Sequence, residues 1–365
     1  MGEARRQLVF VVGTRAQLIK VAPVMVACER AGLPSWLLMT GQHHDTMQDL
    51  VDEFGIHSPQ LQALPSKEHA TVRSLLRWLP AAYVGVRRRL RGIASPATPM
   101  DVLVHGDTLS TVVGAIAGRR SGARVVHLES GLTSGRLLDP FPEELCRRLV
   151  FRLADIAMCP NAQAAGYMRA HHRAVVVDTG GNTIVDAVAL SGASPADRDR
   201  EHPYVVASLH RFQNLYDTSR LRDLVALVQS VAAHHPIHFV LHPATRKRLA
   251  KEGLLETLSA TAGVRLSPRL GYREFLQLAA RAACVLTDGG SNQEELAALG
   301  VPTIVMRERT ERPDGLGANA IMEGDVVGGV DRFLLEGRFE ALRRAPAIAA
   351  GGLSPSAVII DALAG

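Results

Sequence analysis

Short apolar runs alternate with amphipathic segments along almost the whole of this 365-residue chain. The runs are rich in β-branched residues, as in Gln7–Gly13, Asp101–Asp107 and Cys284–Gly290, and segments with helical periodicity lie between them. Buried strands that alternate with helices are typical of parallel sheets, because each parallel connection crosses over through a helix and both faces become covered. The pattern therefore predicts an α/β fold.

The polar stretch Ser191–Pro203 interrupts this alternation, and the same kind of unit restarts after it. A chain of this length suits two domains, and a hydrophobic content of 47% with 21% charged residues allows a core in each. We expect two doubly wound, Rossmann-like domains facing a central cleft. Their predicted bounds are residues 1–190 and residues 191–365, with a last helix able to pack back on the first domain.

Composition excludes several classes of function. The net charge of +5 is mild, and the densest basic run, Arg87–Arg91, has no interleaved aromatic residues. It therefore indicates a solvated helix face rather than nucleic-acid binding. No apolar run approaches the ~20 residues of a membrane span, and no signal-peptide core precedes the first strand-like run. Dispersed cysteines and adjacent histidine pairs lack metal-ligand spacing. We expect a cytoplasmic protein without a metal or cofactor.

Polar residues and glycines follow nearly every strand-like run. In open parallel sheets, ligands bind beyond the carboxyl ends of the strands. Loops are polar in any protein, but seven such ends rich in His, Asp, Glu and Arg indicate a cleft lined by both domains. The seven ends are Gly13-Thr14-Arg15, Gly41-Gln42-His43, His105-Gly106-Asp107, His127–Ser130, His210-Arg211, His242-Pro243 and Asp288-Gly289-Gly290.

An acidic group marks the first domain. Asp107 and Glu129 end neighbouring strand-like runs, and Glu143 and Glu144 begin a predicted helix. Acids at a helix N-terminus complement the helix dipole, which suits Glu144 but does not explain acids at strand ends. Converging carboxylates raise one another's pKa, which prepares acid/base pairs. His210, at the first strand end of the second domain, is expected to face this group.

Two features suit a phosphate ligand. Arg15 can make a bidentate contact with a diphosphate, although an ordinary surface pair with a nearby acid is equally compatible with its position. The turn at Gly289, Gly290 and Ser291 lies between a strand and a helix, where backbone N–H groups and the helix dipole favour an anion. The segment Gly13–Lys20 lacks the G-K-[ST] ending of a P-loop, so a nucleoside triphosphatase is not expected.

A set of motifs resembles the non-hydrolysing UDP-N-acetylglucosamine 2-epimerases, a family with the GT-B fold of glycosyltransferases. The resemblance covers nearly the whole chain, and the motifs follow the family's order and approximate spacing. They are GTRAQLIKVAPVM, TGQHHDTM, HGDTLST, HLESGL, PFPEELCRR, GNTIVDA, LHRFQN, HPATRKRL, LGYREFL and TERP.

The resemblance implies a UDP-sugar as substrate and a homodimer. In this family the C2 proton is removed, UDP leaves from C1 to give a glycal, and reprotonation on the other face precedes the return of UDP. The positions that match the acid/base residues are Asp107, Glu129, Glu143 and His210. The diphosphate residues match Arg15 and the turn Gly289-Gly290-Ser291, and the ribose-binding glutamate matches Glu295. Gln42, His43, Arg211, His242 and Arg312 complete the expected substrate-binding set.

Some residues depart from the family's pattern. Gln17 stands where the family has glutamate, and Thr133 where it has arginine. In some bacterial members, a segment that matches Gln42–Asp45 helps to bind a second, activating UDP-sugar, and the residues of this segment also differ from the family's pattern. A different 2-acetamido sugar, from a cell-surface polysaccharide or an antibiotic or other secondary-metabolite pathway, is therefore compatible with the sequence. Conversion of UDP-GlcNAc to UDP-ManNAc is the leading hypothesis, and a GT-B glycosyltransferase is the alternative. The intact acid/base residues favour the epimerase.

Overall fold

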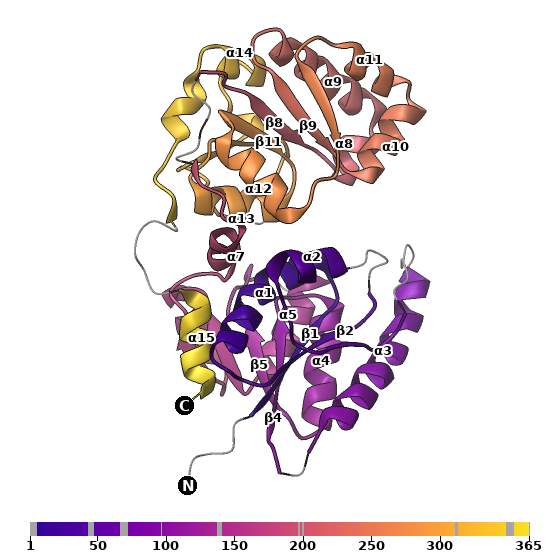
Figure 1. Cartoon of the computed structure of the whole chain (residues 1–365), viewed down its shortest axis with the longest axis vertical. Helices are drawn as coiled ribbons and strands as arrows, with labels where there is room; N and C mark the ends of the chain where they lie inside the picture. The colour runs from indigo at the N-terminus through magenta and orange to yellow at the C-terminus, as the bar shows by residue number, and fades with distance from the viewer. Residues whose placement is uncertain are drawn as a thin grey trace. The chain divides into compact units, whose positions relative to one another are not determined.

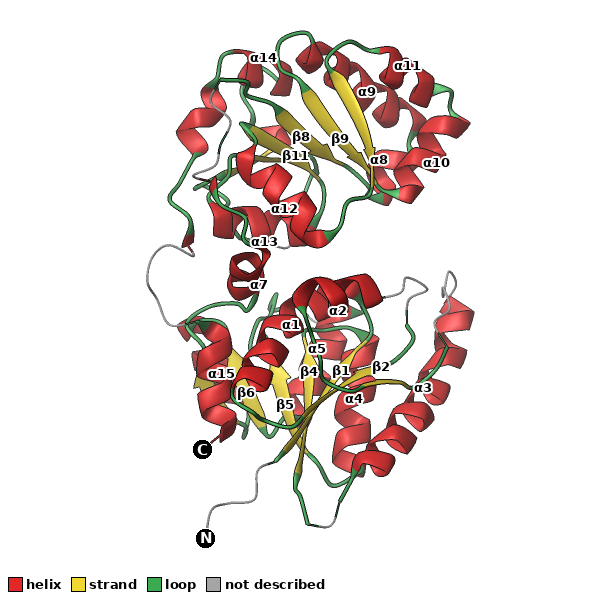
Figure 2. Ribbon diagram, viewed as in Figure 1, coloured by secondary structure: helices red, strands yellow, loops and turns green. Residues whose placement is uncertain are grey.

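A computed structural model describes residues 6–42, 47–65, 72–95, 97–136, 141–195, 198, 201–310, 313–347 and 354–364. The chain forms two compact units, one of Met1–Leu190 with Leu353–Gly365 and one of Ser191–Gly352. Each unit contains a parallel sheet with helices on its faces (Figures 1 and 2). The predicted α/β class with two doubly wound sheets is therefore confirmed.

The sheet of the first unit has seven strands among the described residues. Their order is β3-β2-β1-β4-β5-β6-β7, and every neighbouring pair is parallel. The central strands are apolar and buried because helices cover both faces. The strands are β1 (Gln7–Val12), β2 (Ser35–Met39), β3 (Gln60–Gln62), β4 (Met100–His105), β5 (Arg124–Leu128), β6 (Ile156–Cys159) and β7 (Val175–Asp178).

Helices connect these strands. They are α1 (Arg15–Arg30), α2 (Gln48–Phe54), α3 (Val72–Ile93), α4 (Leu109–Arg120), α5 (Glu143–Leu153), α6 (Ala162–His171), α7 (Ile184–Ser191) and α15 (Pro355–Ala364). Side-chain caps define where several of them begin, including α6, at which Asn161 accepts from the backbone N–H of Ala164. The Thr14 hydroxyl accepts from the backbone N–H of Gln17 at the start of α1, and Thr108 forms a capping box with Thr111 at the start of α4. The C-terminal helix α15 lies against α1.

The second unit has a six-stranded parallel sheet among the described residues, in the order β10-β9-β8-β11-β12-β13. Its strands are β8 (Val205–Ser208), β9 (Ile237–Leu241), β10 (Val264–Pro268), β11 (Cys284–Thr287), β12 (Thr303–Val305) and β13 (Ala320–Met322). Its helices are α8 (Phe212–Tyr216), α9 (Thr218–Ala232), α10 (Pro243–Lys251), α11 (Leu254–Ala260), α12 (Tyr272–Arg281), α13 (Gly290–Leu299), α14 (Val330–Leu335) and the 3-10 helices η2 (Glu323–Asp325) and η3 (Arg338–Leu342).

The strand order reverses direction once in each sheet. In the first unit the chain proceeds outward from β1 through β2 to β3, and then from β4 toward the opposite edge, so the reversal lies between β1 and β4. In the second unit it lies between β8 and β11. Connections leave the sheet on opposite faces at such a point, which opens a crevice at the carboxyl ends of the strands. Both candidate site regions described below lie at these points.

No helix in the described segments is long and apolar enough to cross a membrane.

Candidate active site

The acidic residues of the first unit lie where two neighbouring strands end. Asp107 lies between β4 and α4, and Glu129 directly follows β5. Because β4 and β5 are paired in parallel, with His105 opposite Leu128, both acids leave the same edge of the sheet. Glu129 has a φ of 59°, the only positive φ of a non-glycine residue in the described part of the chain. Such a conformation costs roughly 1–3 kcal/mol and occurs preferentially at functional sites.

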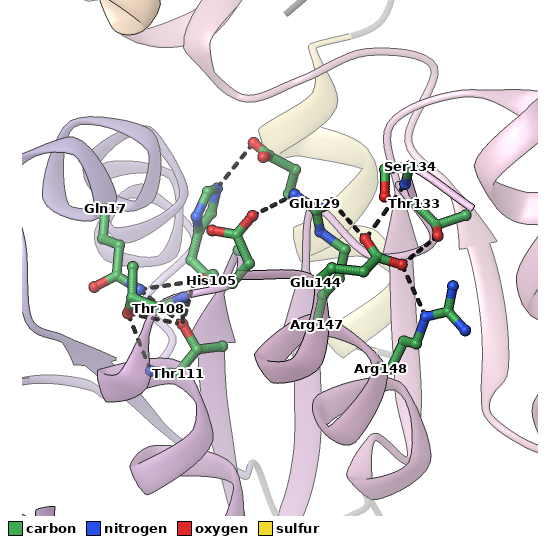
Figure 3. Close-up of polar contacts among 12 residues, drawn as sticks. Gln17, His105, Thr108, Thr111, Glu129, Thr133, Ser134, Glu144, Arg147 and Arg148 are labelled. Atoms are coloured by element: carbon green, nitrogen blue, oxygen red, sulfur yellow. Dashed lines mark hydrogen bonds and ion pairs between the residues drawn. The ribbon is translucent and has the colours of Figure 1, made fainter. Parts of the chain in front are cut away.

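Three side chains contact the carboxylate of Glu129. Lys20 Nζ and Asn182 Nδ2 both donate to Oε2 at 2.5 Å, and His105 Nε2 lies 3.5 Å from the same oxygen (Figure 3). The side chains of Lys20 and Glu129 are only 4% and 11% exposed. Ion pairs removed from water in this way hold both partners in a defined position. Glu129 is therefore fixed from three elements of the fold.

Asp107 is paired with Arg147 of α5. The same guanidinium donates to Glu144 at 3.1 Å, so Arg147 lies between the two carboxylates (Figure 3). Glu144 is fully buried and also accepts from Thr133 Oγ1 at 2.5 Å and from Arg148 Nε at 2.9 Å. Burial alone would raise the pKa of Glu144, but these hydrogen bonds outweigh it and lower the pKa. Thr133 thus contributes a hydroxyl to the support of Glu144.

Glu143 differs from these acids in its hydrogen bonding. It is the first residue of α5, and its Oε2 atom is buried with no hydrogen-bond partner among the described residues. Burial raises the pKa of the nearby Cys146 thiol to about 11, and the charges of Asp107 and Glu143 raise it further. Glu143 lies one helical turn before Arg147 on α5, and Arg147 pairs with Asp107, so the structure brings Asp107 and Glu143 to the same region.

Arg15, the predicted diphosphate residue, begins α1. Its guanidinium makes a bidentate pair with Asp49 of α2, at 2.5 and 2.6 Å. Gln42 accepts from the hydroxyl of Ser110 at 2.5 Å, so both residues lie around the reversal between β1 and β4. His43 and Arg312 lie outside the described residues.

Three functional candidates in the first unit were missed from the sequence. Lys20 and Asn182 belong to motifs quoted above, but neither motif shows that its polar side chain contacts Glu129. Gln17 is only 3% exposed. It accepts from Gly13 N at 2.9 Å and donates to the carbonyl oxygen of His105 at 2.7 Å. An amide can both accept and donate here, whereas an ionised carboxylate can only accept, which explains why glutamine suits the position.

In the second unit, His210 lies just beyond β8, next to the residues that follow β11. The backbone N–H groups of His210 and Arg211 donate to the carboxylate of Asp288 at 2.9 Å each. Arg211 Nε donates to the Asp288 carbonyl oxygen at 3.0 Å. The His242 ring lies 5.4 Å from the His210 ring, measured between centroids. His210, Arg211 and His242 are therefore clustered beyond the carboxyl ends of β8 and β9.

The turn at Gly289, Gly290 and Ser291 opens α13. A Cβ atom on Gly289 would lie 3.1 Å from Cε1 of His210, so the absence of a side chain lets the imidazole approach the turn. Thr287 Oγ1 accepts from Gly289 N and from Asn292 Nδ2, both at 3.1 Å. These bonds define the conformation of the turn. Glu295, expected at the ribose, is 2% exposed.

Comparison with known proteins supports the resemblance noted in the sequence. The family model described as UDP-N-acetylglucosamine 2-epimerase matches residues 27–328. The UDP-N-acetylglucosamine 2-epimerase of Bacillus subtilis (strain 168) is 30% identical over 327 residues, covering 86% of this chain and 82% of the relative. The UDP-2,3-diacetamido-2,3-dideoxy-D-glucuronate 2-epimerase of Pseudomonas aeruginosa is 30% identical over 321 residues, covering 84% of each chain.

A solved structure has the same fold. The UDP-GlcNAc 2-epimerase of Methanocaldococcus jannaschii, crystallised with UDP-GlcNAc and UDP, superposes with a TM-score of 0.74 at 25% identity. The match covers 98% of this chain and 99% of that one. The two parallel sheets are thus those of a GT-B epimerase. This chain belongs to the UDP-N-acetylglucosamine 2-epimerase family.

Proposed function

We propose that this protein is a non-hydrolysing 2-epimerase of a UDP-2-acetamido sugar, with UDP-GlcNAc and UDP-ManNAc as the leading substrate pair. The observation that carries the proposal is the group of carboxylates at the reversal of the first sheet. Asp107 and Glu129 leave adjacent strand ends, and Glu143 lies one helical turn before Arg147, the partner of Asp107. The similarity to a UDP-N-acetylglucosamine 2-epimerase and to a UDP-2,3-diacetamido-2,3-dideoxy-D-glucuronate 2-epimerase supports this choice.

The proposed reaction begins with removal of the C2 proton by a carboxylate. The C–H electron pair forms the C1–C2 double bond, and the C1–O bond breaks so that its electrons leave with UDP. The resulting glycal receives a proton at C2 on its opposite face, and UDP adds back at C1. Acid/base groups are needed on both faces of the ring, and cationic or N–H groups are needed at the departing diphosphate.

The described residues can be matched to these needs. Asp107 and Glu129 are ion-paired with Arg147 and Lys20, which suits carboxylates that accept a proton. Glu143 Oε2 has no hydrogen-bond partner among the described residues, so this oxygen is available for contact with a ligand. We assign Asp107, Glu129 and Glu143 to proton transfer at C2 without assigning a face to each.

The second unit is assigned to UDP. His210, Arg211 and the N–H groups of the turn at Gly289 would stabilise the departing diphosphate, because an N-terminal helix end favours an anion. The remaining assignments are Arg15 to the diphosphate, Glu295 to the ribose hydroxyls, and Gln42, His43, His242, Gly290, Ser291 and Arg312 to further substrate contacts.

The test is incubation of the full chain with UDP-GlcNAc in deuterium oxide, followed by proton NMR at C2. We expect loss of the H2 signal and the appearance of UDP-ManNAc without an acceptor. Asp107→Asn and Glu129→Gln should each slow C2 exchange by about 10²–10⁴-fold. Asp155→Asn is the matched control, because Asp155 is an acid paired with Arg119 and the two side chains are 38% and 46% exposed. The Asp155→Asn variant should exchange the C2 proton at the normal rate. Release of UDP only when an acceptor is added, with no exchange at C2, would instead establish the glycosyltransferase.

We also propose that the protein works as a homodimer in the cytoplasm, where nucleotide sugars are made. An apolar groove between α3 and α4 is available as part of a subunit contact. It is lined by Leu79, Pro80, Tyr83, Val112, Val113, Ile116 and Arg120. Light scattering after size-exclusion chromatography should give twice the chain mass of 39.3 kDa. A mass of one chain at micromolar concentration would reject the dimer.

A further inference from the structure

Asp288 is a buried carboxylate that the proposed reaction does not use. It directly follows β11 and has no exposed side-chain surface. Its Oδ1 atom lies 3.3 Å from Nδ1 of His210, and its oxygens also accept from the backbone N–H groups of His210 and Arg211. The carboxylate therefore holds both the backbone and the ring of His210.

The surroundings of the His210 ring determine which nitrogen can face a ligand. Nδ1 faces Asp288, and Cε1 lies against the turn, 3.1 Å from where a Cβ atom of Gly289 would lie. The side chain of His210 is 38% exposed, whereas Asp288 is fully buried. Because the two ring nitrogens lie on different sides of the imidazole, Nε2 is the nitrogen left for contact outside this pocket.

A network from other elements holds Asp288 in turn. Asn214 Nδ2 donates to Asp288 Oδ2 at 2.8 Å and to the Met306 carbonyl oxygen at 2.9 Å. Arg220 Nε donates to Asn214 Oδ1 at 3.2 Å and pairs with Glu323. A carboxylate with this many donors remains in place while the ring beside it changes charge, which is the arrangement expected of a group that orients a catalytic histidine.

The charges around His210 show why such a carboxylate is needed. Burial is the main cause that lowers the pKa of His210, and the guanidinium groups of Arg211, Arg269 and Arg307 lower it further. Asp288 is the group that raises it, and His242 is the other titratable ring in contact. Three cations that suit a diphosphate therefore work against a protonated imidazole, and Asp288 opposes them.

We propose that Asp288 is the positioning residue of His210. The Asp288 carboxylate keeps the proton of the neutral His210 ring on Nδ1 and directs Nε2 to the departing diphosphate. This inference rests on the proposed epimerase reaction. As the C1–O bond breaks and its electrons pass to the UDP oxygen, protonated His210 donates its Nε2 proton to that diphosphate oxygen. The ring takes the proton back when UDP adds to C1, so His210 and Asp288 end each turnover unchanged.

The first test needs no catalysis. Nitrogen-15 NMR of the full chain labelled at histidine, with His210→Gln to identify the signals, gives the tautomer of the neutral ring. We expect the proton on Nδ1. A proton on Nε2 in the wild-type chain would overturn the proposal, whether or not the protein is an epimerase. An Nδ1 proton in a chain without C2 exchange would reject the proposed function and leave the pairing intact.

The second test is Asp288→Asn, which keeps the shape and removes the charge. An opposite charge at this range shifts a pKa by about one to three units, so the NMR-measured pKa of His210 should fall by that amount. Activity needs the imidazolium, and the high-pH limb of the rate profile should move down by the same amount. Asn214→Ala is the control, because it removes one hydrogen bond from the same pocket but keeps the Asp288 carboxylate. The high-pH limb of its rate profile should not move. Lower activity of Asp288→Asn with an unmoved limb and an unchanged His210 pKa would show a purely structural role.

Discussion

Lys20 and Glu129 form a nearly buried ion pair in the candidate site. At 2.5 Å, two unit charges attract each other by about 7 kcal/mol for an effective dielectric constant of 20. Much of this is offset by the loss of water around both groups. Removing one partner of a buried pair nevertheless costs about 3–5 kcal/mol, because the other charge stays buried. Asn182 still donates to Glu129, so we expect Lys20→Met to cost about 3 kcal/mol, at the lower end.

The chain offers a direct assay for this loss. Both tryptophans, Trp36 and Trp78, lie in the first unit, so their fluorescence during urea unfolding reports on the unit that holds the pair. Lys20→Met, Glu129→Gln and the double variant form a cycle that isolates the coupling between the two side chains. Arg119→Met is the control, because its pair with Asp155 is about half exposed and should contribute less than about 1 kcal/mol.

The double variant gives the more specific result. If Lys20 acts by compensating the charge of Glu129, the double variant should be more stable than the sum of the two single losses predicts. Additive losses, or a loss below about 1 kcal/mol for Lys20→Met, would refute the interpretation of this contact as a buried ion pair.

Four further outcomes follow from the first unit. Burial lowers the pKa of His127 to about 4, below the ~6.5 of an unfolded histidine. The neutral ring therefore contributes fully to the free energy of unfolding above pH 6.5, and this contribution decreases by up to about 3 kcal/mol toward pH 4. In urea unfolding, the stability of His127→Asn should depend less on pH over that range. A Cβ atom on Gly13 would lie 1.8 Å from a buried serine hydroxyl, so Gly13→Ala should lower the urea midpoint by the equivalent of about 1–3 kcal/mol. Gly166→Ala, in a helix with open space around it, should raise stability by about 0.5–1 kcal/mol. Gln17→Glu places a carboxylate against a carbonyl oxygen that the amide now contacts at 2.7 Å and should cost about 1–3 kcal/mol at pH 7, with a smaller loss at pH 4, where the new acid is protonated.

The sequence was sufficient for the fold class and for the edge of each sheet that carries the candidate site. Both conclusions rest on short-range information. Apolar runs separated by helical segments predict parallel sheets, and parallel strands place all their carboxyl ends at one edge. Asp107, Glu129 and His210 could therefore be selected as strand-end residues before any coordinates were considered. The motifs, in their order along the chain, were likewise sufficient for the family.

The partners of those residues could not be predicted in the same way. Lys20 and Asn182 lie 109 and 53 positions from Glu129 in the sequence. The pair between Arg15 and Asp49 of α2 likewise joins residues 34 positions apart. The positive φ of Glu129 has no signature in a residue type that rarely adopts it.

The sequence by itself determined which side chains lie at the carboxyl edge of each sheet, because the alternation of strands and helices follows from local residue patterns. Only the tertiary structure decided which of these side chains are paired. Lys20 with Glu129, Arg147 with Asp107, and Asp288 with His210 each depend on the register of neighbouring strands and the packing of helices across them. Charge pairing depends on distances of a few ångströms between residues far apart in the chain, and those distances exist only after the sheet has formed.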